Sequence, residues 1–497
     1  MKPSAVRKAL KELPKTLDET YERILLNIPE EYFPDAQVIF ALLAYGSRSV
    51  SVAEVAEALA INLEEASFDA RDRLADPCGV LKICPSLLTL SPFQSQTWTW
   101  RKSVIAADEK KKALRFAHYS VKEYLISQRW SSTTSHLFKL DIDSGHDLIA
   151  QLCLSYLLSI CDALQPTLDT FRSLPLLQYA ANFWHVHYRA THLGDNEKTR
   201  DMALRLFQKG NETSLRNALT AVGRREVTPL YYASQFGLVD ICQHILASGV
   251  DVDAHGGGYG NALQVAALYG HEVIVRLLID NGADVNTRGG AVRGRSALQY
   301  AATNGHCAIV RLLLSKGANI DAKARSDVAI ANALQGAIFG KHAPIVSLLL
   351  ENHVDVNAQG GAFGNALQVA AFTGSEEFVR LLIENGALVN AQGGRFGNAL
   401  QAAIQAREYG IVRLLIENGA NVNAQGGKYG NPLRAACIQR DEYLVRLLLK
   451  NGAQVKDHGL DIQDNMLEAA IIEGEDAIVK VLMEAAKEEF GNTHYSV

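Results

Sequence analysis

The second half of the chain repeats one pattern of hydrophobic and polar positions with a fixed period. Each unit holds a short segment rich in alanine and leucine, as at 365–371, and a second apolar segment, as at 379–383. The spacing of the apolar positions predicts two helices per unit, and the polar run Asn-Ala-Gln-Gly-Gly predicts a turn to the next unit. Because a fixed period lets each unit pack only on its neighbours, the pattern predicts a stacked solenoid.

One leucine opens the first helix of every unit and marks the repeats. It falls at Leu230, Leu263, Leu298, Leu334, Leu367, Leu400, Leu433 and Leu467. Most successive leucines are separated by the same number of residues as Leu334 and Leu367. The intervals that end at Leu298 and Leu334 contain more residues. We therefore expect about eight repeats over 226–490 and a tail at 491–497. One unit buries too few apolar side chains to fold alone, so stability should rise with repeat number.

These units resemble the ankyrin repeat. The resemblance rests on the period, on Thr-Pro-Leu at 228–230 and on Gly-Ala-x-Val-Asn after the second helix. It covers residues 226–490 and implies an all-α, ankyrin-repeat solenoid without catalytic activity or cofactor. It also implies that the chain is an interaction module or scaffold, which binds a partner protein through the concave face and the turn tips of the array.

The region before the array, 1–225, shows a different pattern. Residues 13–25 predict an amphipathic helix with Thr16 as its N-cap. Two helices are expected within 36–62 and another near 66–76, and alternating apolar positions in 80–105 predict strands. This order predicts three parts: a connector helix at 1–30, a winged-helix domain at 31–128 and a helical linker region at 129–225.

Two segments of this region resemble fungal NACHT–ankyrin proteins, which are similar to the NOD-like receptors of animals. Phe-Ala-His-Tyr-Ser-Val-Lys-Glu-Tyr-Leu at 116–125 resembles the winged-helix region that follows their nucleotide-binding domain. Tyr-Ala-Ala-Asn-Phe-Trp-His at 179–185 resembles the helical connector before their ankyrin arrays. The resemblance covers about residues 5–190. It implies that His118 is a candidate nucleotide sensor, because the histidine of this motif faces the diphosphate of bound ADP in that family.

Members of that family bind ATP through a P-loop, Gly-x-x-x-x-Gly-Lys-Ser/Thr. This sequence holds no such run, and its nearest match, at 336–342, has the wrong spacing and lies inside a repeat. We therefore expect no nucleotide site and no cofactor, and a chain that is either a naturally truncated relative or an incomplete gene model. An alternative function follows: a regulatory or sensor fragment that acts beside a NACHT-type P-loop ATPase on another chain.

A winged helix can also bind DNA, so a DNA-binding regulator is a further alternative. The expected third helix near 69–74 alternates Arg71 and Arg73 with aspartates, which makes a poor surface for a phosphate backbone. The basic run at 110–112 is a better candidate contact, although short charge runs are usually solvated loops. The net charge of −5, with about +2 in the region 1–225, argues against nucleic acid as the partner.

The composition is that of an ordinary globular chain, with 48% hydrophobic and 21% charged residues. No apolar run is long enough to span a bilayer, and the start at Met1 does not resemble a signal peptide. The seven cysteines are scattered and odd in number, which is typical of buried thiols in a reducing compartment. We expect the cytoplasm, or alternatively the nucleus, as the location, and no contact with a membrane.

Two features of the repeats are candidate partner-binding sites. The turns at 286–297 and 319–333 are longer than the others, and long turns are often functional. Their basic residues predict a contact for an acidic partner segment: Arg288, Arg293, Arg295, Lys323 and Arg325. Aromatic residues recur at the turn tips, where packing on the adjacent turn is favoured over a ligand-facing row: Tyr259, Phe363, Phe396 and Tyr429.

Three other features recur at fixed positions. Arginines of the second helices stand one helical turn before an acid, as in Arg276 and Asp280 or Arg380 and Glu384, which predicts solvated pairs within one helix. Glutamines of the first helices are expected to bond the backbone of neighbouring turns: Gln264, Gln299, Gln335, Gln368 and Gln401. First helices are expected to end in the left-handed conformation, at Gly270, Gly305, Gly374 and at the aligned Lys341, Arg407 and Arg440.

No group of residues resembles a catalytic or metal site. Ser120 beside His118 lacks an oriented third member for nucleophilic catalysis. Two pairs of possible ligands lack a complete set at zinc spacing: Cys78 and Cys84, and His185 and His187. We therefore expect a binding protein and not an enzyme.

Overall fold

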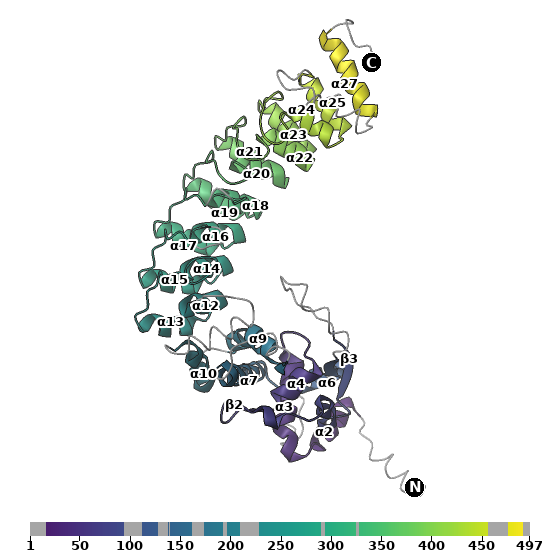
Figure 1. Cartoon of the computed structure of the whole chain (residues 1–497), viewed down its shortest axis with the longest axis vertical. Coiled ribbons are helices and arrows are strands. Elements are labelled where there is room, and N and C mark those ends of the chain that lie inside the picture. Colours follow the sequence, from purple (N-terminus) through teal and green to yellow (C-terminus); the bar gives the residue numbers. More distant parts are fainter. Residues whose placement is uncertain are drawn as a thin grey trace. The chain divides into compact units, whose positions relative to one another are not determined.

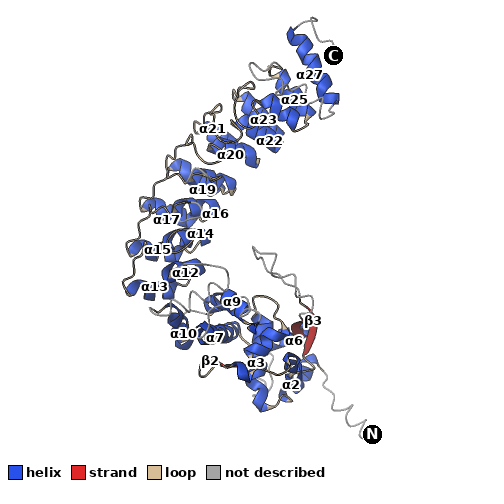
Figure 2. Ribbon diagram, viewed as in Figure 1, coloured by secondary structure: helices blue, strands red, loops and turns tan. Residues whose placement is uncertain are grey.

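The computed structural model describes residues 16–93, 112–127, 138, 140–161, 173–191, 196–208, 228–289, 294–324, 328–455 and 476–490. The chain divides into two compact units (Figure 1). The N-terminal unit comprises Met1–Pro229 and Phe236–Gly249, and the array unit comprises Leu230–Gln235 and Val250–Val497. Helices predominate in both units, and the strands of the described residues all lie in the N-terminal unit (Figure 2).

The first half of the N-terminal unit combines helices with two small antiparallel hairpins. Its helical elements are α2 (Leu17–Leu26), η1 (Glu30–Tyr32), α3 (Phe33–Tyr45), α4 (Val52–Ala58), η2 (Ala70–Asp72), η3 (Pro77–Gly79), α5 (Val80–Ile83) and α6 (Tyr119–Ile126). Strand β1 (Ile61–Asn62) pairs with β2 (Ser67–Phe68), and β3 (Leu88–Pro92) pairs with β4 (Lys112–Phe116). A bridge between Ser51 and Ala113 joins the start of α4 to the second hairpin.

The helix starts in this region follow from capping residues. Thr16 accepts a hydrogen bond from the Glu19 backbone N–H at 3.1 Å, which confirms the predicted N-cap. Ser51 and Glu54 form a capping box at the start of α4, where each side chain accepts a backbone N–H of the other residue. Two otherwise unpaired backbone donors are thereby satisfied at that helix end.

The prediction of a helix near 66–76 is wrong. This segment contains β2 and then only the single turn η2. Asp69 and Asp76 accept hydrogen bonds from the backbone N–H groups of Arg71 and Cys78, and such local acceptors compete with helix formation. The α-helix that follows, α5, is short and begins only after Pro77. Arg71 and Arg73 therefore do not lie on an α-helix.

The second half of the N-terminal unit is a layer of longer helices. The helix α7 (Ile142–Cys161) packs against α3, α9 (Leu177–Ala190) and α10 (Glu197–Phe207). The core of this layer contains the fully buried rings of Tyr156, Tyr179 and Trp184. The helix α13 (Val239–Ala247) also belongs to this unit, because it packs on α10 and its Asp240 accepts a hydrogen bond from the Tyr188 hydroxyl.

The array unit is built from pairs of short helices. The first helices are α12 (Pro229–Phe236), α14 (Ala262–Tyr269), α16 (Ala297–Asn304), α18 (Ala333–Phe339), α20 (Ala366–Thr373), α22 (Ala399–Ala406) and α24 (Pro432–Ile438). The second helices are α15 (Glu272–Asp280), α17 (Cys307–Ser315), α19 (Ala343–Glu351), α21 (Glu376–Glu384), α23 (Tyr409–Glu417) and α25 (Glu442–Lys450). The helix α27 (Asp476–Phe490) packs on α25. The leucine expected to open an eighth repeat, Leu467, lies outside the described residues.

Both ends of the first helices follow from residues that the sequence repeats. Each N-cap side chain accepts a backbone N–H from the first turn of its helix, at Asn261, Ser296, Asn332, Asn365, Asn398 and Asn431. The expected left-handed ends are confirmed, with positive φ at Gly270, Gly305, Gly374, Lys341, Arg407 and Arg440. The last three carry a Cβ in a conformation that favours glycine, and they are therefore strained.

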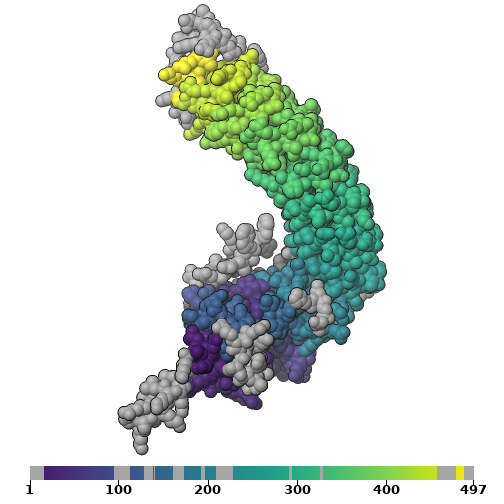
Figure 3. All heavy atoms as spheres, turned by 180° about the vertical axis from the view of Figure 1, so that it is seen from behind, coloured from purple at the N-terminus to yellow at the C-terminus, as the bar shows by residue number. Residues whose placement is uncertain are grey.

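The repeats stack through small and apolar side chains. Figure 1 shows the first helices α14 to α22 in succession along one side of the array and the second helices α15 to α23 along the other, and neighbouring first helices pack directly on one another. The alanines at the contacts are fully buried, as at Ala266 and Ala267, and the leucines that open each first helix are buried too. Figure 3 shows the atoms of successive repeats in unbroken contact. The core of the array is thus continuous from repeat to repeat, as the solenoid prediction requires.

Candidate functional site

An asparagine ladder, which was not predicted from the sequence, joins the base of four turns to the next repeat. The Asn357 side-chain amide donates to the Gly386 carbonyl at 3.0 Å, and its oxygen accepts the Leu388 backbone N–H at 2.8 Å. The same two bonds recur in other repeats, at Asn286, Asn390 and Asn423. The signal was the periodic Val-Asn in the sequence. These bonds fix each of these turns to its neighbour.

The predicted glutamine ladder is confirmed at four positions. The side-chain amides donate to backbone carbonyls of the next turn, from Gln264, Gln299, Gln335 and Gln368. The bond from Gln368 to the Gly393 carbonyl measures 2.8 Å, and its amide oxygen also accepts the Asn365 backbone N–H. Gln401 departs from the prediction, because both polar atoms of its amide are buried without a hydrogen-bond partner among the described residues.

Backbone hydrogen bonds also link the turn tips. The residues just before the recurring aromatics are the tip residues, Ala362, Arg395 and Lys428, and none of them is buried. The Arg395 N–H donates to the Ala362 carbonyl, and the Lys428 N–H donates to the Arg395 carbonyl, both at 2.8 Å. Successive turns lie so close that a Cβ on Gly394 would stand 2.4 Å from the Phe363 carbonyl carbon. The tip side chains therefore line one edge, one per repeat.

The aromatic residues of the turns pack inward. Phe363, Phe396 and Tyr429 are buried. Phe372 of α20 lies with its ring centroid 5.1 Å from those of both phenylalanines. The ring of Tyr259 packs edge-on against that of Tyr300, with 5.9 Å between the centroids. This arrangement agrees with the favoured interpretation, packing on the adjacent turn. A partner cannot reach the Phe396 ring in this conformation, because that side chain is fully buried.

The basic residues of the two long turns are placed unequally. Arg288 and Lys323 are exposed. Arg295 is buried and its carbonyl accepts the Gln264 amide, so this residue does not lie on the surface. Arg293 and Arg325 lie outside the described residues. The described part of this patch therefore offers two exposed cations from neighbouring turns.

The ion pairs of the second helices run in the opposite direction to the prediction. Arg380 pairs with Glu376, one helical turn before it, at 2.6 Å, instead of with Glu384. Arg276 and Arg446 make the same kind of pair with Glu272 and Glu442. A glutamate on the N-terminal side of the cation is the better orientation, because it also suits the helix dipole. All these pairs are exposed and stabilise the array little.

Histidines at the starts of three second helices form a further ladder that was not predicted. Each ring donates from Nε2 to a backbone carbonyl near the end of the preceding first helix at 3.1 Å, from His271, His306 and His342. The signal was a histidine directly after the left-handed residue in these three repeats. In later repeats Glu408 and Asp441 replace the histidine, so the sequence of the array changes at this point.

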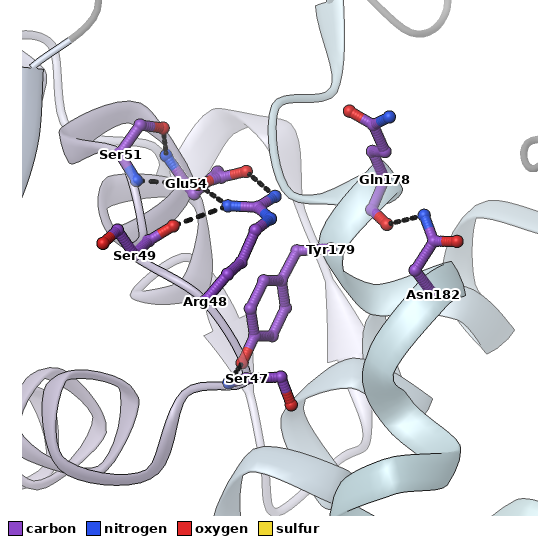
Figure 4. A network of polar contacts seen from close by, with 8 residues as sticks. All are labelled: Ser47, Arg48, Ser49, Ser51, Glu54, Gln178, Tyr179 and Asn182. Carbon is purple, nitrogen blue, oxygen red and sulfur yellow. Dashed lines mark hydrogen bonds and ion pairs between the residues drawn. The ribbon is translucent and has the colours of Figure 1, made fainter. Parts of the chain in front are cut away.

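In the N-terminal unit, Arg48 is the centre of a buried polar cluster between α3, α4 and α9 (Figure 4). Its guanidinium pairs with Glu54 at 2.5 Å and lies 5.1 Å from the centroid of the Tyr179 ring. The Tyr179 hydroxyl accepts the Ser47 backbone N–H at 3.2 Å. The cluster ties the turn after α3 to α9, and its charges are paired, as burial requires.

Two more buried groups have shifted pKa values. Glu57 is buried beside Arg73 at 2.7 Å and accepts the Tyr156 hydroxyl, and burial raises the pKa of its carboxyl against the lowering effect of these two partners. Burial, with His146 at 2.8 Å, lowers the pKa of His187 to about 3. His187 lies on α9 in the layer of longer helices, and Glu57 of α4 contacts Tyr156 of that layer; a structural role accounts for these contacts.

The candidate nucleotide sensor His118 is exposed at the start of α6. Its Nδ1 accepts the Ser120 backbone N–H as an N-cap and lies 2.5 Å from the Ser120 hydroxyl. That hydroxyl lies 2.6 Å from the hydroxyl of Tyr21 on α2. The histidine thus has a capping role in this unit.

The part of the chain that the structure describes shows no metal-binding cluster and no membrane-spanning helix. It holds no group of three or more histidine, cysteine or acidic side chains that could bind a metal ion. Cys84, Cys153, Cys242 and Cys437 are buried, whereas Cys78 is exposed. No described helix combines the length and apolar character needed to cross a bilayer.

Comparison with known proteins identifies the repeats. The family model described as ankyrin repeats in three copies matches residues 153–288, 230–324 and 333–426. The azaphilone pigments biosynthesis cluster protein L of Monascus ruber is 32% identical over 306 residues, which cover 56% of this chain and 61% of that protein. The crystal structure of the human ASB11 ankyrin repeat domain is 26% identical, with a TM-score of 0.38, and covers 46% of this chain and 99% of that chain.

Proposed function

The chain belongs to the ankyrin repeat family, and we propose that it is a scaffold that binds a partner protein through the first helices and turn tips of its array. Binding of another protein is the activity that ankyrin repeats indicate. The stacked pairs give the array a long surface of fixed spacing, which suits recognition of an extended or helical partner better than catalysis.

The observation that carries this proposal is the fixed edge of turn tips. Arg395 and Lys428 stand on neighbouring turns that backbone hydrogen bonds hold together. The turns below them are fixed by the asparagine ladder, as at Asn390. A preformed surface loses little conformational entropy on binding, which is an advantage in a binding site.

The test is capture of partners by the full chain immobilised on beads, followed by identification of the bound proteins. Replacement of the tip residues Arg395 and Lys428 by alanine should reduce capture, whereas the same change at Arg380 and Arg446 on the second helices should not. Alanine is compatible with the tip, because Ala362 occupies the equivalent position one repeat earlier. Equal capture by both variants would contradict this location of the site.

A second candidate function is that of a regulatory companion of a NACHT-type ATPase. The observation in its favour is an exposed apolar surface on two helices of the N-terminal unit, α2 and α6, which pack on each other. Leu17, Tyr119 and Ile126 are exposed there, and the exposed His118 lies beside Tyr119. Apolar side chains that form a contiguous exposed patch mark docking surfaces, whereas single exposed ones are common on any protein. Co-purification of a P-loop protein, lost on replacement of Tyr119 by serine, would support this function.

The winged-helix domain remains part of the proposal for the N-terminal unit. The order α3, α4, α5 and the β3–β4 hairpin, with Ser51 bridged to Ala113, is the order expected of a winged helix. DNA binding gains no support, because Arg71 and Arg73 pair with Asp69 and Glu57. A gel shift with random duplex DNA tests this alternative. A protein–DNA complex that migrates more slowly than the free DNA would support DNA binding.

A further inference from the structure

The charges of the later repeats are divided between the two sides of each helix pair. The segments 356–374, 388–407 and 421–440 each contain one turn and one first helix, and they hold no aspartate or glutamate. We name them the acid-free segments. Their charged residues are all basic: Arg395, Arg407, Lys428, Arg434 and Arg440. The acids of the same repeats stand on or at the start of the second helices, as do Glu376 and Glu408, except Asp355, which directly precedes the first acid-free segment.

The two cations at the turn tips are fixed in place without a carboxylate. The Arg395 guanidinium lies 4.8 Å from the centroid of the Phe396 ring, and the Lys428 ammonium lies 5.2 Å from that of Tyr429. Within the described residues neither makes an ion pair, in contrast to Arg380 of the second helices. A cation held over an aromatic ring is oriented but not neutralised, so both remain available to an external anion.

Apolar side chains accompany these cations. Phe339 and Ile438, at the ends of the first helices α18 and α24, are each 47% exposed. The Phe339 ring lies 6.2 Å from that of Phe363 and so continues the aromatic packing of the turns outward. A ligand that covered this side would therefore meet both positive charge and apolar surface.

We propose that the acid-free segments bind an acidic protein segment that carries apolar side chains. The proposal rests on the proposed function as a protein-binding array and names the chemistry of its partner. Nucleic acid fits less well, because single strands bind by stacking on exposed rings, and the rings beside Arg395 and Lys428 are buried.

The experiment identifies ligands by selection from random sequences. Short random peptides displayed on phage are selected against the full chain, and the enriched peptides are synthesised with a fluorescent label. We expect the enriched peptides to be rich in aspartate and glutamate beside leucine or aromatic residues. Replacement of Arg395 and Lys428 by alanine should weaken their binding on the order of 30-fold, and binding to the unaltered chain should weaken as salt is raised.

The control removes the same charge from the opposite side. Replacement of Arg380 and Arg446 by alanine should leave affinity within about twofold, because these residues are paired and lie on the second helices. Enriched peptides that are not acidic, or equal losses in both variants, would overturn the proposal and leave the proposed function standing. Failure to enrich any peptide would contradict both. Tighter binding of a labelled DNA oligonucleotide to the same residues would show that the ligand is nucleic acid and not a protein segment.

Discussion

The two units bury their polar groups by different chemistry. The array buries mainly neutral amides that recur with the repeat, such as Gln335 and Gln368, and each bonds to backbone of the next turn. Arg295 and Asp441 are buried charged residues of the array. The N-terminal unit instead buries ionisable side chains that occur once, such as Glu57 and His187. The stability of the array should therefore change little with pH. The stability of the N-terminal unit should depend strongly on pH and on the side chains that pair with its buried ionisable groups.

The tryptophans provide a way to follow the units separately. All four, Trp98, Trp100, Trp130 and Trp184, lie before the array. Tryptophan fluorescence therefore reports unfolding of the N-terminal unit, whereas far-UV circular dichroism also reports the array. Urea titrations with both probes allow a variant to be assigned to one unit.

The largest effect is expected from Arg73→Met. The substitution leaves Glu57 buried with only the Tyr156 hydroxyl bonded to it among the described residues, and an uncompensated buried charge costs about 3 kcal/mol. The fluorescence transition should move to lower urea by this amount. Arg71→Met is the matched control, because its pair with Asp69 is exposed and should contribute nothing measurable. Equal effects of the two substitutions would show that Glu57 does not depend on its partner.

Acidification should destabilise the N-terminal unit through His187. Its folded pKa of about 3 lies below the value of about 6.5 in the unfolded chain. The stabilisation is therefore complete above pH 6.5 and is lost as pH falls through the interval down to 3. Between pH 7 and pH 5 the loss should be roughly 2 kcal/mol, and His187→Asn should remove this part of the pH dependence. The raised pKa of Glu57 has the opposite effect on the pH dependence of stability. Glu57 is present in both the unaltered protein and His187→Asn, so its effect cancels when their pH profiles are compared. Identical pH profiles would contradict the assignment.

Within the array, two glutamines at equivalent positions should behave differently. Gln368→Leu removes bonds to Asn365 and Gly393 and should cost roughly 1–2 kcal/mol, since it leaves backbone groups unpaired. Gln401→Leu removes an amide that has no hydrogen-bond partner among the described residues and should be neutral or stabilising. Circular dichroism of both variants checks the contrast. A similar loss for both would mean that Gln401 is bonded in solution.

The smallest effect concerns the left-handed ends of the first helices. Arg407→Gly and Arg440→Gly should each stabilise the array by up to about 1 kcal/mol, because φ is 59° and 55° there. Arg446→Gly, inside a second helix, should destabilise it by a similar amount. Thermal melting followed by circular dichroism compares them. The same sign for all three would show that backbone conformation does not decide the outcome.

The array could be predicted further than the N-terminal unit because its signals repeat. The period placed the helix pairs, and the left-handed ends followed from residues such as Gly374. Predictions about features that occur only once in the sequence were wrong where local and tertiary interactions compete. Asp69 favoured a turn over the expected helix near 66–76, and the burial of Arg295 depends on its neighbours and leaves no trace in the sequence.

The proposed site shares its chemistry with the contact predicted from the sequence but lies in other repeats. A basic contact for an acidic partner was expected in the long turns, whereas the cations held over aromatic rings lie at Arg395 and Lys428. The absence of acids from 388–407 and 421–440 can be read from the sequence. It becomes meaningful only when the structure shows that these segments share one side of the helix pairs.

The most direct test of this account is hydrogen–deuterium exchange of the full chain with and without a selected acidic peptide. Bound peptide should slow exchange in the turns and first helices of 388–407 and 421–440, and Arg395→Ala with Lys428→Ala should abolish this protection. Protection confined to the second helices, or to the N-terminal unit, would contradict the claim that the acid-free segments form the binding surface.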